Sequence, residues 1–163
     1  ESDLTDRRPK VLGLVIDEVD DRLHKERSKN DVALWIGNWL ASGFVDRLFS
    51  MLLDNGYHIY LTADHGNVES IGVGRPNQGV IAETRGERVR VYRSESLLAD
   101  SAAAYPGTLK LDIAGLPANF MPLFAGGRTA FVPEGDQVVA HGGVSVEELI
   151  VPFVKVSYEV GST

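Results

Sequence analysis

A long amphipathic stretch in the first third of the chain constrains the fold more than any other feature. Apolar residues in segment 32–53 recur mostly at spacings of three and four, which is typical of a helix that packs one face against a core. Asp31 can cap the start of this helix, and Asn55-Gly56 is a strong signal for its end. Ser42-Gly43 can divide the stretch, so it predicts either one long helix or two consecutive helices.

Short apolar runs flank the helical stretch and predict two buried strands. The first run covers 11–16 and leads into the acidic cluster 17–21, and the second covers 57–62 and leads into the polar segment 63–67. A strand, a helix and a strand in this order form a βαβ unit, whose strands are parallel. We therefore predict an α/β fold with a mostly parallel sheet flanked by helices. Chemistry in such sheets lies beyond the carboxyl ends of the strands, where both polar clusters fall.

The remaining segments predict shorter elements. Segment 71–79 is rich in glycine and proline and predicts a loop, and prolines argue against long regular elements between 105 and 125. Further strands are predicted at 87–93, 129–132, 138–140 and 151–158, and Ser94 and Ser145 can each cap a short helix, the second with Glu148 at the capping-box position. The polar residues 1–9 are expected to be a leader or linker, followed by one domain over 10–163.

The composition excludes several classes of protein. The chain has 163 residues, no cysteine and a net charge of −7. Disulfides, thiolate metal ligands and cysteine nucleophiles are therefore excluded, and no apolar run approaches the ~18 residues of a membrane span. The acidic balance disfavours broad nucleic-acid binding by this chain alone, and we expect a cytoplasmic protein. The one basic stretch, 75–93, includes Arg85, Arg88 and Arg90, which either form a solvated strand face or contact phosphate.

Three clusters of polar residues carry candidate metal ligands. Asp20 and His24 are four residues apart, a spacing that puts a carboxylate and an imidazole on the same side of a helical turn. Asp64 and His65 follow a predicted strand, and His141 precedes two glycines. Each cluster alone has an ordinary explanation as an ion pair or a turn. Together they offer two carboxylates and three imidazoles at strand ends, which is a nearly complete ligand set for two divalent ions, Zn²⁺ or Mn²⁺.

Segment 62–67, Thr-Ala-Asp-His-Gly-Asn, resembles the TADHGN segment of the alkaline phosphatase superfamily, as found in cofactor-independent phosphoglycerate mutases. This resemblance implies that Asp64 and His65 bind one metal ion. Asp20-x-x-x-His24 is similar to the D-x-x-x-H pair of the superfamily, which binds the second metal ion. His141 matches the later histidine that completes the second site.

The neighbouring sequences are closer to the PglZ domain, a branch of this superfamily tied to bacterial anti-phage systems. The similar stretches are 61–69, 82–92 and 141–154, and the resemblance spans about residues 10–158. It implies metal-dependent hydrolysis of a phosphate monoester or diester. It also implies that other defence-system proteins are partners. Nucleic acid would be a partner only through the longer parent protein of which this chain is expected to be a part.

One part of the superfamily pattern has no counterpart in this sequence. The superfamily places an aspartate ligand and a serine or threonine nucleophile before the D-x-x-x-H pair, and only nineteen residues precede Asp20. We therefore expect the C-terminal half of an alkaline phosphatase-like domain, with no catalytic residue of its own, no activity when alone, and the N-terminal half as its partner. An alternative takes Asp17 as the first aspartate and Ser28 as the nucleophile. A non-catalytic metal-binding or interaction module and a phosphoglycerate-mutase-like phosphotransferase are the other functions that stay open.

Overall fold

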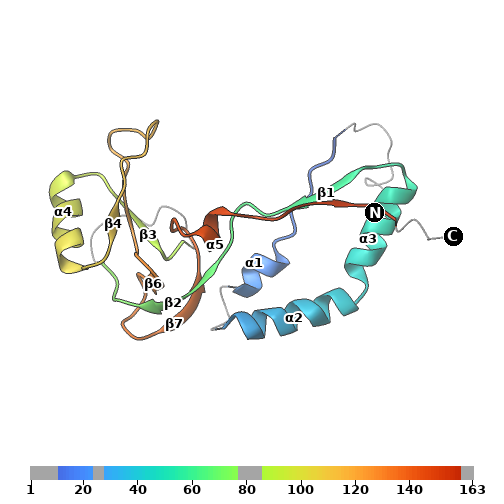
Figure 1. The fold of residues 1–163 in the computed structure, drawn as a ribbon, viewed down its shortest axis with the longest axis horizontal. Coiled ribbons are helices and arrows are strands. Elements are labelled where there is room, and N and C mark those ends of the chain that lie inside the picture. The colour runs from blue at the N-terminus through green and yellow to red at the C-terminus, as the bar shows by residue number, and fades with distance from the viewer. Residues whose placement is uncertain (1–10, 24–27, 77–85, 159–163) are drawn as a thin grey trace.

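The computed structural model describes residues 11–23, 28–76 and 86–158 of the chain. It has two lobes that are joined by a two-stranded ribbon (Figure 1). The first lobe contains the helices α1 (Glu18–Leu23), α2 (Lys29–Ala41) and α3 (Phe44–Asp54). The second lobe contains α4 (Glu95–Ala104) and two three-stranded sheets, and the short helix α5 (Val146–Leu149) lies where this lobe meets the ribbon.

The amphipathic stretch folds as two consecutive helices, α2 and α3, which confirms the predicted division at Ser42-Gly43. The start of α2 differs from the prediction, because Ser28 and not Asp31 is its N-cap. The Ser28 hydroxyl accepts the Asp31 backbone N–H at 3.2 Å and donates to the Asp31 carboxylate at 2.7 Å. Asn55 caps the end of α3 as predicted. None of the helices in the described part of the chain has the length and apolar character needed to span a membrane.

The ribbon pairs two strands that are far apart in the sequence. β1 (Ile59–Thr62) and β8 (Phe153–Val156) are antiparallel, with Ile59 opposite Val156 and Thr62 opposite Phe153. Ile59 is buried against Leu48 and Leu52 of α3, and this cluster fixes the ribbon to the helical lobe. The other side chains of both strands are exposed or half-buried. Among the described residues, neither outer edge of the ribbon pairs with a further strand.

The second lobe contains the best-buried core of the described residues. In one sheet, β2 (Val68–Gly72) lies between the parallel β6 (Thr129–Ala130) and the antiparallel β7 (Gln137–Ala140). In the other, β5 (Met121–Phe124) lies between β3 (Val89–Tyr92) and β4 (Leu109–Lys110), both antiparallel to it. A cluster of buried side chains joins the second sheet to α4, and it includes Tyr92, Leu123, Phe131 and the partly buried Leu98.

The prediction of a mostly parallel sheet is wrong. Only β2 and β6 are parallel, and the other strand pairs of the described residues are antiparallel. The apolar run 11–16 forms no strand: Val11 and Val15 are 89% and 87% exposed, and Leu12 packs against the cluster of α3 and β1. β1 pairs with β8 instead. An apolar run indicates strand character, but its partner is set by contacts with a distant segment that periodicity does not reveal.

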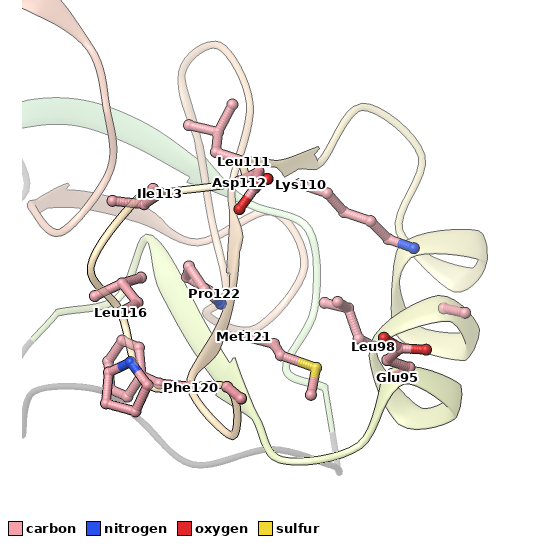
Figure 2. A pocket seen from close by; sticks show the side chains of 13 residues that line it. Glu95, Leu98, Lys110, Leu111, Asp112, Ile113, Leu116, Phe120, Met121 and Pro122 are labelled. Atoms are coloured by element: carbon pink, nitrogen blue, oxygen red, sulfur yellow. The ribbon is translucent and has the colours of Figure 1, made fainter.

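An open groove of about 660 Å³ lies between α4 and segment 110–122 of the second lobe (Figure 2). Its lining combines apolar side chains, among them Leu98, Leu116 and Met121, with the charged Glu95, Lys110 and Asp112. No histidine lines this groove, so the metal chemistry suggested by the sequence has to be sought elsewhere in the molecule.

Candidate metal centre

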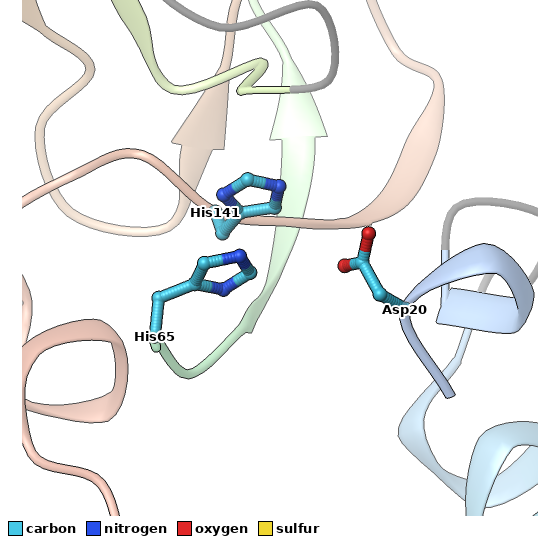
Figure 3. Close-up of side chains that lie close together, drawn as sticks. All are labelled: Asp20, His65 and His141. Atoms are coloured by element: carbon cyan, nitrogen blue, oxygen red, sulfur yellow. The ribbon is translucent and has the colours of Figure 1, made fainter. Parts of the chain in front are cut away.

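Asp20, His65 and His141 meet in one cluster (Figure 3). Each offers one ligand atom, and these three atoms lie within 4.8 Å of one another. Asp20 comes from α1, His65 from the turn between β1 and β2, and His141 from the residue that follows β7. The rings of His65 and His141 are stacked, with centroids 3.8 Å apart and planes at 11°. His141 is buried, and Asp20 and His65 are half-buried.

The register of two strands explains why the histidines meet. β7 runs antiparallel to β2, with Ala140 opposite Val68. The chain that leaves β7 at His141 therefore passes the chain that enters β2, and His65 lies there. Gly66 allows this close passage, because a Cβ at its position would lie 1.9 Å from the Glu147 carbonyl oxygen. The Gly66 backbone N–H instead donates to the Glu148 carbonyl at 2.9 Å.

Local hydrogen bonds orient the His65 ring. Its Nδ1 lies 3.1 Å from the Gly66 carbonyl oxygen. A proton on Nδ1 would be donated to this carbonyl and would place the lone pair of the neutral ring on Nε2, where a metal ion can use it. The Asp64 carboxylate accepts the His65 backbone N–H at 3.0 Å and lies 3.8 Å from Nε2 through its other oxygen.

The donor set fits a divalent metal ion. Two imidazoles and one carboxylate are a ligand set of catalytic zinc sites, in which three protein ligands leave a position for water or substrate. Imidazole and carboxylate ligands also suit Mn²⁺. The three residues come from segments that are far apart in the sequence and converge on one point, as a metal centre requires (Figure 3).

The cluster combines residues that the sequence analysis divided between two ions. His65 was predicted to join Asp64, and Asp20 and His141 were predicted to join His24. In the structure His65 lies with Asp20 and His141, while the Asp64 side chain is 89% exposed and is not part of the three-residue group. His24 lies outside the described residues. The assignment of all five residues to two ions therefore stays a prediction.

The arginines that were considered for phosphate contact are placed differently. Arg90 lies on β3 and Arg88 directly precedes this strand, and both are buried. Arg85 lies outside the described residues. The Arg90 guanidinium donates to the carbonyl oxygens of Val89 and Phe131 at 2.8 Å each, and burial lowers its pKa. Both side chains are therefore buried structural parts of this strand region and do not lie on a solvated face, and the phosphate-contact role of Arg85, Arg88 and Arg90 stays a prediction.

A buried ion pair beside the cluster was missed by the sequence analysis. Arg88 Nε donates to Glu148 Oε1 at 2.8 Å, with side-chain exposures of 1% and 2%. Burial alone would raise the pKa of Glu148, but hydrogen bonds from Arg88, Ser145 and Gly143 outweigh it and hold the pKa below its usual range. Two features of the sequence could have indicated this pair. They are the capping box of Ser145 and Glu148, which the structure confirms, and the position of Arg88 within an apolar strand pattern.

The fold and the cluster define an α/β protein with a candidate divalent-metal centre of aspartate and histidine. The chain belongs to the family described as the BREX system PglZ alkaline phosphatase-like domain, which it matches over residues 3–156. This family is phosphoesterase-like, is associated with BREX defence, and is of a kind that typically binds divalent metals. Searches of the curated proteins and of the solved structures gave no match.

Proposed function

We propose that this chain is the metal-binding part of a phosphoesterase domain that acts in bacterial phage defence. The observation that carries the proposal is the meeting of Asp20, His65 and His141 within 4.8 Å in a member of an alkaline phosphatase-like family. The substrate class is a phosphate monoester or diester. The three side chains come from α1, the β1–β2 turn and the end of β7, so the fold itself assembles the site.

The site is proposed to hold two divalent ions, Zn²⁺ or Mn²⁺. Asp64 and His65 would hold one, and Asp20, His24 and His141 the other. The adjacent positions of the His65 and His141 rings support ions that are neighbours, as in a two-metal centre. When bound, such ions polarise phosphoryl oxygens and neutralise the charge that develops during transfer. The protein side chains would hold these ions, and hydrogen bonds to the ligands would orient them.

The nucleophile is proposed to come from a further part of the domain that packs against the ribbon. Ser28, the alternative nucleophile, caps α2 through its hydroxyl. The ribbon leaves both edges unpaired among the described residues and exposes apolar side chains, including Phe153 at 73%. A two-stranded sheet alone is marginally stable, so additional strands beside β1 or β8 would give it a core. This supports the interpretation of residues 10–163 as the C-terminal part of the domain.

Metal binding by matched histidine variants tests the proposal. Isothermal titration with Zn²⁺ and with Mn²⁺ should show binding to the wild-type chain and a large loss of affinity in His141→Ala. His58→Ala is the control, because His58 is exposed next to β1 and is not part of the cluster. Equal affinities of wild type and His141→Ala would refute the site.

Hydrolysis assays separate a complete enzyme from a metal-binding part. With p-nitrophenyl phosphate or bis-p-nitrophenyl phosphate and either metal, we expect the chain alone to give no efficient turnover. The full-length parent should hydrolyse one of the two. Robust turnover by this chain that His65→Ala abolishes would show that the nucleophile lies within it. Metal binding without turnover by the parent would favour the non-catalytic module.

A further inference from the structure

The Arg88–Glu148 ion pair is the most deeply buried charged pair among the described residues. The Glu148 carboxylate accepts the Arg88 Nε–H at 2.8 Å, the Gly143 backbone N–H at 2.7 Å and the Ser145 backbone N–H at 3.1 Å. The rest of the Arg88 guanidinium donates to the Ser70 hydroxyl at 3.2 Å and to carbonyl oxygens of the turn 125–129. Four segments of the second lobe are therefore tied to one pair of side chains.

Arg88 and Glu148 hold the backbone that leaves His141. The Arg88 backbone N–H donates to the His141 carbonyl at 3.2 Å. Two residues further on, the Gly143 N–H donates to the Glu148 carboxylate. Gly143 also lies against both partners, because a Cβ at its position would come within 2.6 Å of Glu148 Oε2 and 2.9 Å of Arg88 Nε. The segment from the His141 carbonyl to Gly143 is thus fixed by Arg88 at its start and by Glu148 at its end.

Glu148 also reaches the His65 turn, through its own backbone carbonyl. The Gly66 N–H donates to the Glu148 carbonyl at 2.9 Å, and Gly66 directly follows His65. Glu148 therefore binds the His65 turn through its backbone and the His141 loop through its side chain. The two stacked rings are both held from this one residue of α5.

We propose that Arg88 and Glu148 are the positioning pair of the candidate metal centre and set the spacing of His65 and His141. This inference rests on the proposed metal-binding function and assigns the pair a role in that site. Neither side chain is placed in contact with substrate. The pair acts through the backbone of the two loops, so its loss should move the imidazoles apart or turn them and weaken metal binding.

The chain offers a matched control next to Glu148. Glu147 on the same helix pairs with Arg128 at 2.9 Å, but these side chains are 42% and 61% exposed. Glu147→Gln and Glu148→Gln make the same chemical change one residue apart. In Glu148→Gln the amide nitrogen cannot accept the Ser145 N–H, and the charge that faces Arg88 is lost. In Glu147→Gln only an exposed pair is weakened.

The experiment measures Zn²⁺ and Mn²⁺ affinity by isothermal titration at 10 °C, with far-UV circular dichroism to show that each variant is folded. Glu148→Gln should bind about 10–100-fold more weakly than wild type, the effect expected when a group that orients a ligand is lost. Glu147→Gln should stay within about twofold of wild type. A variant that is only destabilised melts earlier but binds normally while folded, so equal affinity of a folded Glu148→Gln and wild type would overturn the inference.

A metal-free measurement separates this inference from the proposed function. The stacked rings should give a nuclear Overhauser effect between His65 and His141, since their centroids are 3.8 Å apart. If the wild type binds no metal, the proposed function fails, and the inference is judged by this contact alone. Its loss in Glu148→Gln and retention in Glu147→Gln would support the positioning role, and its retention in both would overturn it.

A second pair of variants covers the case in which Glu148→Gln does not fold. Arg88→Lys keeps the charge but loses the planar fork of donors, and Arg128→Lys is its exposed counterpart. The same titration and ring-contact measurements then apply, with the same expected differences. Loss of the fold in both Glu148→Gln and Arg88→Lys would overturn the inference, because the pair would then serve the fold as a whole and not the site.

Discussion

Replacement of Arg88 by methionine tests how strongly the buried pair stabilises the second lobe. Methionine fills much of the arginine volume but leaves the Glu148 carboxylate 2% exposed, with only backbone donors from Gly143 and Ser145. Removal of one partner of a buried pair costs about 3–5 kcal/mol, because the other charge stays buried without compensation. At the size of this chain, each kcal/mol lowers the melting temperature by about 2–4 °C, so a decrease of about 6–20 °C is expected.

The exposed pair gives the reference for this measurement. Arg128→Met removes a partner of the exposed Glu147, and we expect a loss of about 0–1 kcal/mol. Urea unfolding is followed by far-UV circular dichroism and by tryptophan fluorescence. Both tryptophans, Trp35 and Trp39, lie on α2, so their fluorescence reports the helical lobe. If Arg88→Met lost no more free energy of unfolding than Arg128→Met, the reasoning from burial would be refuted.

Three further predictions concern the same region. The pKa of the Glu148 carboxyl is lower in the folded than in the unfolded chain, so the carboxylate contributes its full stabilisation above the unfolded pKa near ~4.3. This stabilisation is lost as the pH falls through the folded pKa. Glu148→Gln should therefore reduce the loss of unfolding free energy at acidic pH in a curve of stability against pH. Gly66→Ala should lower the free energy of unfolding in urea by about 1–3 kcal/mol, since its Cβ would meet the Glu147 carbonyl. A Cβ at Gly37 on α2 would have nothing within 4 Å, so Gly37→Ala should raise the free energy of unfolding by about 0.8–1 kcal/mol. An equal effect of the two variants would contradict the structure. Zn²⁺ at about 100 times its dissociation constant should stabilise the chain by about 2.7 kcal/mol, and an unchanged melting curve with and without chelator would contradict metal binding.

The sequence was most informative where structure depends on neighbouring residues. The spacing of apolar residues predicted α2 and α3, Asn55 predicted the end of α3, and Ser145 with Glu148 predicted the capping box of α5. These features depend on residues within about one helical turn of one another. Strand character was likewise recognised at β1, β3 and β8, although the predicted boundaries were wider than the strands.

Features that depend on distant contacts were predicted poorly. The strand partners were wrong because β1 meets β8 and not the run 11–16. β2 was missed, since no strand was predicted over 68–70 and the segment from Ile71 was placed in a loop. The arginines of the basic stretch were expected on a solvated face or in contact with phosphate. Arg88 and Arg90 are buried instead, because Glu148 and several backbone carbonyls accept hydrogen bonds from them. Composition cannot show which charge has a buried partner.

The convergence of Asp20, His65 and His141 could be predicted because it depends on chemistry as well as on topology. Carboxylates and imidazoles beside glycines at strand ends indicated a shared site even though the assumed sheet was wrong. The residues still converge because the antiparallel register of β2 and β7 brings His65 to His141 as effectively as neighbouring parallel strands would. The division of the ligands between two ions was taken from the superfamily pattern. The observed cluster differs from that division, because it places His65 with Asp20.

The candidate metal centre lies at a junction between the two lobes, so an ion bound there would have a structural consequence. His65 and His141 are held by the β2–β7 register and by Glu148, all in or next to the second lobe. Asp20 belongs to α1, which contacts α2 of the helical lobe. Among the described residues, a further direct bond between these parts is the Lys29 backbone N–H on the Glu69 carboxylate of β2, at 2.6 Å. Ions held by Asp20 and the two histidines would join the lobes at a second point beside this bond. Affinity for such ions would therefore depend on how the lobes are arranged as well as on the geometry of each loop.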